Sequence, residues 1–247
     1  LLTVSKGWRE FGVIFRWPTF GLYILTALLV SSNWLLYIWS VTHSRMVESS
    51  LGYFINPLIN VLLGIIFLGE KLTKAQLVSL SLAAIGVIYL SIDYGRVPWF
   101  ALSIACTFGL YGLLRKIGGA KSTPGLFFET FFLSIFSLGF LVFLHSRGQG
   151  AFVISGLRQT LLLIGAGVVT SVPLLLFNYG SRLIKYSTVG FFQYIAPTLQ
   201  LLVGVLIYRE PFTHKNLIAF SLIWAALVIY TISNFRKKDR TESPVST

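Results

Sequence analysis

The chain has 247 residues, of which 55% are hydrophobic and only 11% are charged, with a formal net charge of +12 at pH 7. This composition excludes an ordinary soluble domain. The 20 Lys and Arg residues occur in ones and twos between long apolar runs, which favours membrane topology over a nucleic-acid surface. The single cysteine, Cys106, excludes a disulfide or a cysteine-rich metal site within one chain.

Long apolar runs follow one another along most of the chain. About 20 apolar residues cross the hydrocarbon core of a bilayer as a helix, and lipid excludes open strands because it offers their backbone no partner. By this length the sequence predicts eight crossings. In chain order they are Pro18 to Ser40, Ser49 to Leu68, Ala75 to Ile92, Val97 to Leu114, Gly125 to His145, Thr160 to Tyr179, Thr188 to Tyr208 and Asn216 to Asn234.

The positive charges alternate with these crossings. Most Lys and Arg residues fall on the side of the N-terminus, and short cytoplasmic loops retain positive charge. The sequence therefore predicts a multi-pass protein of the cell (inner) membrane with both termini cytoplasmic. The basic cluster after Asn234 is interpreted as a stop signal that contacts lipid headgroups.

One segment of the chain recurs. The stretch from Pro57 to Gly64, with Glu70 beyond it, reappears 140 residues later as Pro197 to Gly204, with Glu210 beyond it. Just upstream, Ser49 to Phe54 parallels Ser187 to Phe192 at a spacing of 138. Chance similarity between apolar helices explains matched Leu and Val residues, but not Pro, Gly, Glu and Thr kept in register. We interpret the pattern as a duplication.

The duplication predicts the architecture. The repeated helix is the fourth of five in the second copy but the second of three in the first, so we expect two helices to be missing before Leu1. A repeated unit of five crossings reverses its sidedness, which gives inverted repeats. The expected fold is an all-α integral membrane protein with eight of ten transmembrane helices, in two inverted five-helix repeats of which the first is truncated. The expected domains are residues 1–92 and 97–235, followed by a disordered cytoplasmic tail over 236–247; residues 1–17 would hold a helix end and a cytoplasmic loop.

Catalytic constellations are absent from the sequence. His43, His145 and His214 fall at loops or helix ends with no carboxylate or thiol at ligand spacing. The sequence also lacks a phosphate-binding glycine loop and a GxSxG elbow. We therefore expect no enzyme activity, no metal and no cofactor.

Polar side chains inside the apolar runs are the candidate binding residues. Each must find a partner within the helix bundle or face a wet cavity. They concentrate in and next to the repeated helices, which favours a central substrate site, although amides that only tie helices together remain the alternative. The predicted substrate-binding residues are Asn33, Trp34, Tyr37, Tyr53, Asn56, Gln193 and Tyr194.

Three further residues have candidate roles. Pro57 and Pro197 each remove a backbone hydrogen bond and are candidate hinges, with a purely structural kink as the alternative. Glu129 lies inside an apolar run near the predicted cytoplasmic face. It is a candidate for proton coupling, with a structural role as the alternative.

Three motifs together resemble a known family. The runs from Asn33 to Trp39, Glu48 to Leu58 and Val189 to Leu199 are similar to the RarD subfamily of the EamA family, in the drug/metabolite transporter superfamily. The resemblance extends from about Trp8 to about Asn234. It implies a ten-helix inner-membrane protein of two EamA repeats around a central cavity, with a permease or exporter role. The departure from the family pattern is the missing N-terminal pair of helices.

The leading functional hypothesis is a secondary transporter that moves small organic solutes, such as drugs or metabolites, by alternating access. Its expected partners are a small-molecule substrate and the lipid bilayer, with no nucleic acid, and a homodimer is left open. The alternative is a non-transporting membrane scaffold or sensor, which would have a sealed interior.

Overall fold

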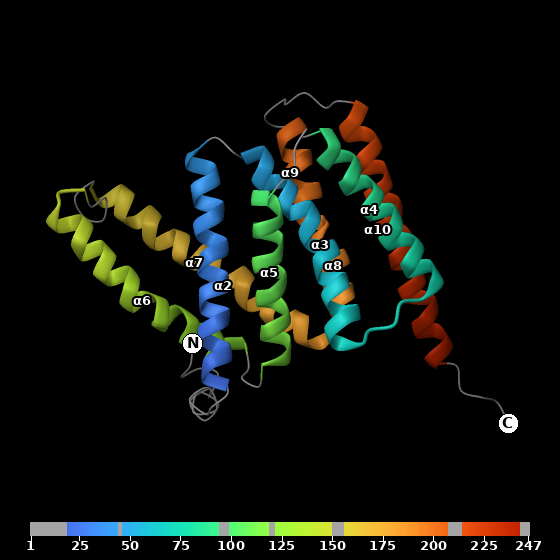
Figure 1. The fold of residues 1–247 in the computed structure, drawn as a ribbon, viewed down its shortest axis with the longest axis horizontal. Helices are drawn as coiled ribbons and strands as arrows, with labels where there is room; N and C mark the ends of the chain where they lie inside the picture. Colours follow the sequence, from blue (N-terminus) through green and yellow to red (C-terminus); the bar gives the residue numbers. More distant parts are fainter. Residues whose placement is uncertain are drawn as a thin grey trace. The chain divides into compact units, whose positions relative to one another are not determined.

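The computed structural model describes residues 19–43, 46–93, 99–118, 122–149, 156–206 and 214–242. Within these ranges the regular elements are helices, and the expected all-α membrane fold is confirmed. They are α2 (Thr19–Thr42), α3 (Met46–Leu68), α4 (Lys74–Asp93), α5 (Trp99–Ile117), α6 (Ser122–Ser146), α7 (Leu157–Leu183), α8 (Tyr186–Gln193), α9 (Ile195–Leu206) and α10 (His214–Glu242), as Figure 1 shows.

The helices follow the predicted crossings closely. Helices α2 to α7 are each long and apolar enough to span a bilayer. The last predicted crossing lies in α10, whose apolar part is the shorter stretch Leu217–Ser233, and α10 continues to Glu242. The segment 1–17 and the repeated Glu210 lie outside the described residues.

The chain divides into two compact units. Unit 1 comprises Leu1–Ser32 and Leu114–Leu183, and unit 2 comprises Asn33–Leu113 and Ile184–Thr247. The division falls within α2 and within α5. Unit 1 contains α6 and α7, which pack against each other, and unit 2 contains α3, α4 and α8 to α10.

Small residues let the helices of unit 2 approach closely. Helix α10 packs along α4, and α8 packs on α3 (Figure 1). A Cβ atom at Gly86 would lie 2.9 Å from the carbonyl oxygen of Ala219, and one at Gly190 would lie 2.6 Å from that of Pro57. Close backbone contact through glycine is a frequent way of packing helices in lipid, where no hydrophobic force drives them together. The α3–α8 contact therefore depends on Gly190.

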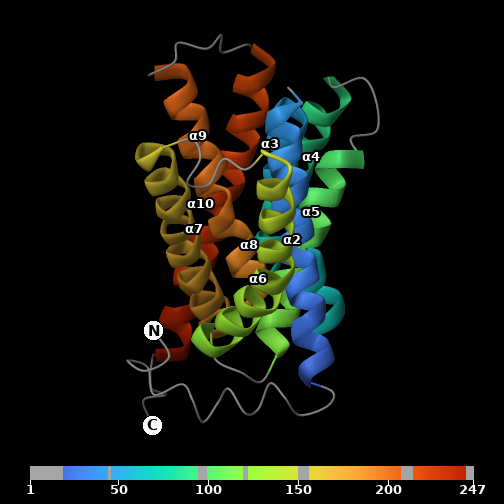
Figure 2. The same ribbon diagram turned by 90° about the vertical axis from the view of Figure 1, so that its left-hand side faces the viewer.

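The seventh predicted crossing is not one continuous helix. Helix α8 ends at Gln193 and α9 begins at Ile195, with α9 following α8 in the same general direction (Figure 2). Its counterpart α3 contains Pro57 without such a break. The second repeat has two more residues between its aromatic pair, Phe191-Phe192, and its proline than the first repeat has after Tyr53-Phe54. Two extra residues would turn a helix by about 200°, so the break at Tyr194 lies where the two matched halves fall out of phase.

The first turn of α8 is capped by a residue that lies just beyond the end of α3. Lys185, at the N-cap position, makes no side-chain capping bond. Instead, the Glu70 carboxylate accepts hydrogen bonds from the backbone N–H groups of Tyr186 (2.6 Å) and Ser187 (2.9 Å) and from the Ser187 hydroxyl (2.5 Å). Gly64 leaves room for the carboxylate, because a Cβ there would lie 2.9 Å from its Oε2. Glu70 thus satisfies donors that a helix N-terminus leaves open and places a negative charge at its positive end.

We expect Glu70→Ala to lower the stability of the protein by about 1–3 kcal/mol, because it removes a charged cap and leaves two backbone donors of α8 without an acceptor. Glu70→Gln retains one acceptor oxygen in nearly the same shape and should lose less. Thermal unfolding of the purified protein in detergent measures both effects. A wild-type melting temperature for Glu70→Ala would show that the cap does not stabilise the fold.

Candidate functional site

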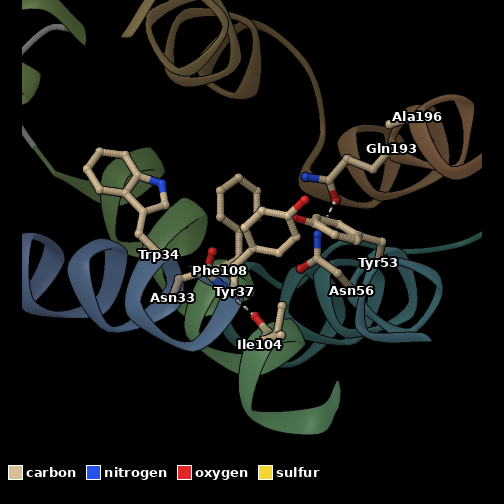
Figure 3. A pocket seen from close by; sticks show the side chains of 9 residues that line it. All are labelled: Asn33, Trp34, Tyr37, Tyr53, Asn56, Ile104, Phe108, Gln193 and Ala196. Atoms are coloured by element: carbon tan, nitrogen blue, oxygen red, sulfur yellow. Dashed lines mark hydrogen bonds between the residues drawn. The ribbon is translucent and has the colours of Figure 1, made fainter. Parts of the chain in front are cut away.

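Unit 2 contains a cavity of about 280 Å³ that opens among its helices. Its walls come from α2, α3, α5 and the junction of α8 with α9 (Figure 3). The lining residues are Asn33, Trp34, Tyr37, Tyr53, Asn56, Ile104, Phe108, Gln193 and Ala196. Aromatic rings and carboxamides thus form most of the wall, as in many small-molecule sites.

Asn33 fixes the α2 side of the pocket to α5. Its Nδ2 group donates hydrogen bonds to the carbonyl oxygen of Ile104 (2.8 Å) and to the hydroxyl of Thr107 (3.0 Å). Asn33 is buried, so these bonds form away from water, where an unpaired amide would be costly. Trp34 and Tyr37, on the same stretch of α2, are thereby held at the cavity wall.

A carboxamide network joins α3 to the end of α8. Gln193 Oε1 accepts hydrogen bonds from the Nδ2 groups of Asn56 (3.0 Å) and Asn60. Asn60 is fully buried and Asn56 nearly so. The Oδ1 atoms of both asparagines have no hydrogen-bond partner among the described residues. The network therefore ties the two helices together, while both Oδ1 atoms stay buried without a hydrogen-bond donor from the described part of the chain.

The repeated prolines stand next to this network. Tyr53 and Gln193 each lie four residues before a proline, Pro57 in α3 and Pro197 in α9. Proline has no N–H, so neither carbonyl can accept the usual helical bond from the residue four positions on. Both Tyr53 and Gln193 line the pocket. So do Asn56 and Ala196, which directly precede the two prolines, and equivalent positions of the two repeats therefore meet at one cavity.

The structure brings most of the predicted binding residues together. Asn33, Trp34, Tyr37, Tyr53, Asn56 and Gln193 all line the cavity. Tyr194 does not; it is 1% exposed and packs in a core cluster with Ala83 and Ile223. Its hydroxyl has no hydrogen-bond partner among the described residues. The binding role of these residues and the hinge role of Pro57 and Pro197 remain predictions.

Three further residues line the cavity that the sequence did not predict: Ile104, Phe108 and Ala196. Ile104 and Phe108 are four residues apart and share a face of α5. The sequence pattern of an apolar face that borders a cavity is the same as that of a face exposed to lipid. Ala196 stands directly before Pro197, as Asn56 stands before Pro57. That correspondence within the repeat was the available signal.

Glu129 lies in unit 1 and is fully buried. Its Oε1 accepts a hydrogen bond from the Thr26 hydroxyl (2.6 Å) and lies 3.5 Å from Arg115 Nε. Arg115 is 1% exposed, donates to the carbonyl oxygen of Ser122 (2.9 Å) and lies over the Tyr23 ring. Such a buried ion pair compensates both charges. Glu129 is not among the residues that line the unit 2 cavity, and its proposed part in coupling stays a prediction.

Comparison with known proteins gives consistent matches. Residues 2–92 and 96–232 match the model of the EamA-like transporter family. An uncharacterized transporter of Vibrio cholerae is 44% identical over 237 residues, which cover 96% of this chain and 78% of that protein. The uncharacterized transporter YojE of Bacillus subtilis is 45% identical, with coverages of 96% and 79%. The protein RarD of Streptomyces exfoliatus is 42% identical, with coverages of 98% and 77%.

A solved crystal structure supports the same fold. It is 17% identical in sequence and has a TM-score of 0.67, covering 97% of this chain and 83% of that chain. At this identity the likeness concerns the fold alone.

The buried ion pair of unit 1 should respond asymmetrically to substitution. Glu129→Leu leaves the Arg115 guanidinium buried without its counter-charge, and we expect a loss of about 3–5 kcal/mol in stability. Replacing both residues, as Arg115→Met with Glu129→Leu, should restore much of that loss because no buried charge remains. Thermal unfolding of the variants measures this. Equal melting temperatures for wild type and Glu129→Leu would contradict the pairing.

Proposed function

Because the chain belongs to the EamA-like transporter family, we propose that it is a secondary transporter that moves small organic solutes through the unit 2 cavity by alternating access. The observation that carries this proposal is the meeting of equivalent repeat positions, Asn56 and Ala196, at one cavity lined by aromatic rings and amides. Inverted repeats place substrate sites at the interface of their equivalent helices.

The helix ends around the cavity suit a change of access. On one side, α3 is held to the first turn of α8 by the three hydrogen bonds to Glu70. At the other end of α8, beside the cavity, the helix is interrupted at Tyr194 before α9 begins. Opening a path past the Glu70 end would require those three bonds to break. The Glu70 cap is therefore the proposed closing contact, and Pro57 and Pro197 are the proposed bending points.

The direction of insertion is part of the proposal. The excess of Lys and Arg on the N-terminal side favours cytoplasmic termini in an inner membrane. The Glu70 end then faces the cytoplasm, together with the neighbouring Lys71 and Lys185. A closed Glu70 contact therefore corresponds to a cavity shut toward the cytoplasm.

Transport in proteoliposomes tests the proposal. Radiolabelled solutes from a panel of drugs and metabolites should cross with wild-type protein, and flux should fall about tenfold with Asn56→Ala or Gln193→Ala, because each removes a carboxamide from the cavity wall. Gln149→Ala changes an exposed amide outside the cavity and serves as the matched control.

Equal flux from wild type and both cavity variants would remove these residues from the transport path. No flux of any solute above protein-free liposomes would favour a membrane scaffold or sensor, in which the amides only join helices.

A further inference from the structure

We propose that the unit 2 cavity selects uncharged solutes that combine one aromatic ring with a carboxamide-like group. This inference rests on the proposed transport function and names its substrate class.

The first relevant feature of the cavity is the charge of its wall. None of the residues that line the cavity carries a charge at neutral pH. Glu70, beyond the end of α3, has both carboxylate oxygens engaged at the first turn of α8. Moving an ion from water into such a wall without a counter-charge is costly, and the cost applies to either sign. An uncharged solute avoids it.

The second feature is the set of hydrogen-bond donors and acceptors in the wall. Gln193 Oε1 is occupied by two donors, from Asn56 and Asn60, and Figure 3 shows the Gln193 carboxamide at the cavity with its nitrogen on the open side. Asn56 Oδ1 has no hydrogen-bond partner among the described residues. That atom is buried, so the polar groups that the wall offers are the NH2 group of Gln193, which donates, and the hydroxyls of Tyr37 and Tyr53, which can donate or accept. Turning all three amides end for end makes Gln193 an acceptor, and the hydroxyls can then donate. A solute carboxamide, with its own C=O and N–H, is the matching group.

The third feature is the shape and volume of the cavity. Much of the remaining wall consists of aromatic side chains, namely Trp34, Tyr37, Tyr53 and Phe108. The rings of Tyr37 and Tyr53 meet edge to face, with their centroids 5.9 Å apart. Figure 3 shows both phenol hydroxyls near the Gln193 carboxamide, so the polar groups gather at one part of the cavity. Ligand pockets commonly measure roughly 300–1,000 Å³, and this one measures about 280 Å³. One ring with a short polar substituent suits that volume.

A series of probes that share a phenyl ring on a three-carbon chain and differ in the charge of their polar groups tests the inference. The compounds are 3-phenylpropionamide (neutral), 3-phenylpropionate (negative), 3-phenylpropylamine (positive) and phenylalanine (zwitterionic). Binding to the purified full chain is measured by titration calorimetry. We expect the neutral amide to bind at least about tenfold more tightly than each charged probe, because only the charged ones lose hydration without a counter-charge.

Gln193→Glu sharpens the test. Glutamate has nearly the same shape and can still accept from Asn56 and Asn60, but it replaces the free donor with a negative charge. The preference should then shift by about tenfold or more toward 3-phenylpropylamine. Gln149→Glu introduces the same charge at an exposed position outside the cavity and should leave the order of the probes unchanged.

The outcomes separate this inference from the proposed function. Stronger binding of a charged probe by wild type, or no binding of the neutral amide, overturns the substrate class. Flux of the probes into proteoliposomes is measured in parallel against protein-free liposomes. Carrier-dependent flux of charged probes alone would overturn the class and leave transport standing. Tight binding of the amide without carrier-dependent flux would support the class and count against transport.

Discussion

A polar group placed between apolar helices must find its partner inside the protein, because lipid offers none. That constraint governs the contacts of unit 2. Glu70 satisfies the open N–H groups of α8, and Asn33 holds α2 to α5. At the far end of α8, Gln193 accepts from two asparagines of α3. Asn33, Asn56 and Gln193 thus both join helices and line the cavity, and structural and binding roles need not exclude each other.

These contacts place α3 and α8 in close register at both ends of α8. Between them Gly190 lets the two backbones meet at Pro57, so the pair has little freedom to slide. Beyond this pair the helix is interrupted, where α8 stops and α9 begins. In the proposed alternating-access cycle, the Glu70 contact closes one end of the pair and the interrupted helix permits a limited change of angle at the other. The repeats thus differ: α3 contains its proline within one continuous helix, whereas its counterpart is divided into α8 and α9.

Much of this could be predicted because bilayer thickness sets helix length and the duplication marks equivalent positions. The apolar runs located the helices, the motifs identified the EamA family, and the polar residues located most of the cavity wall. Other features depend on tertiary contacts. The two-residue shift in the repeat was visible, but its consequence, the break at Tyr194, required the packing of α8 on α3. Likewise, no local pattern links Glu70 to Ser187 or Glu129 to Arg115. The sequence also does not distinguish apolar wall residues such as Phe108 from residues that face lipid.

The central claim is that solute occupies the unit 2 cavity during transport. Ala196 lines that cavity and is exposed, so Ala196→Cys in a Cys106→Ala background places one thiol there. Ser134→Cys on α6, in the same background, is the control outside the cavity. The measurement is the rate of labelling by a small thiol reagent, with and without a transported solute. The account predicts that the solute slows labelling at position 196 and leaves it unchanged at position 134. A rate at position 196 that no transported solute alters would contradict it.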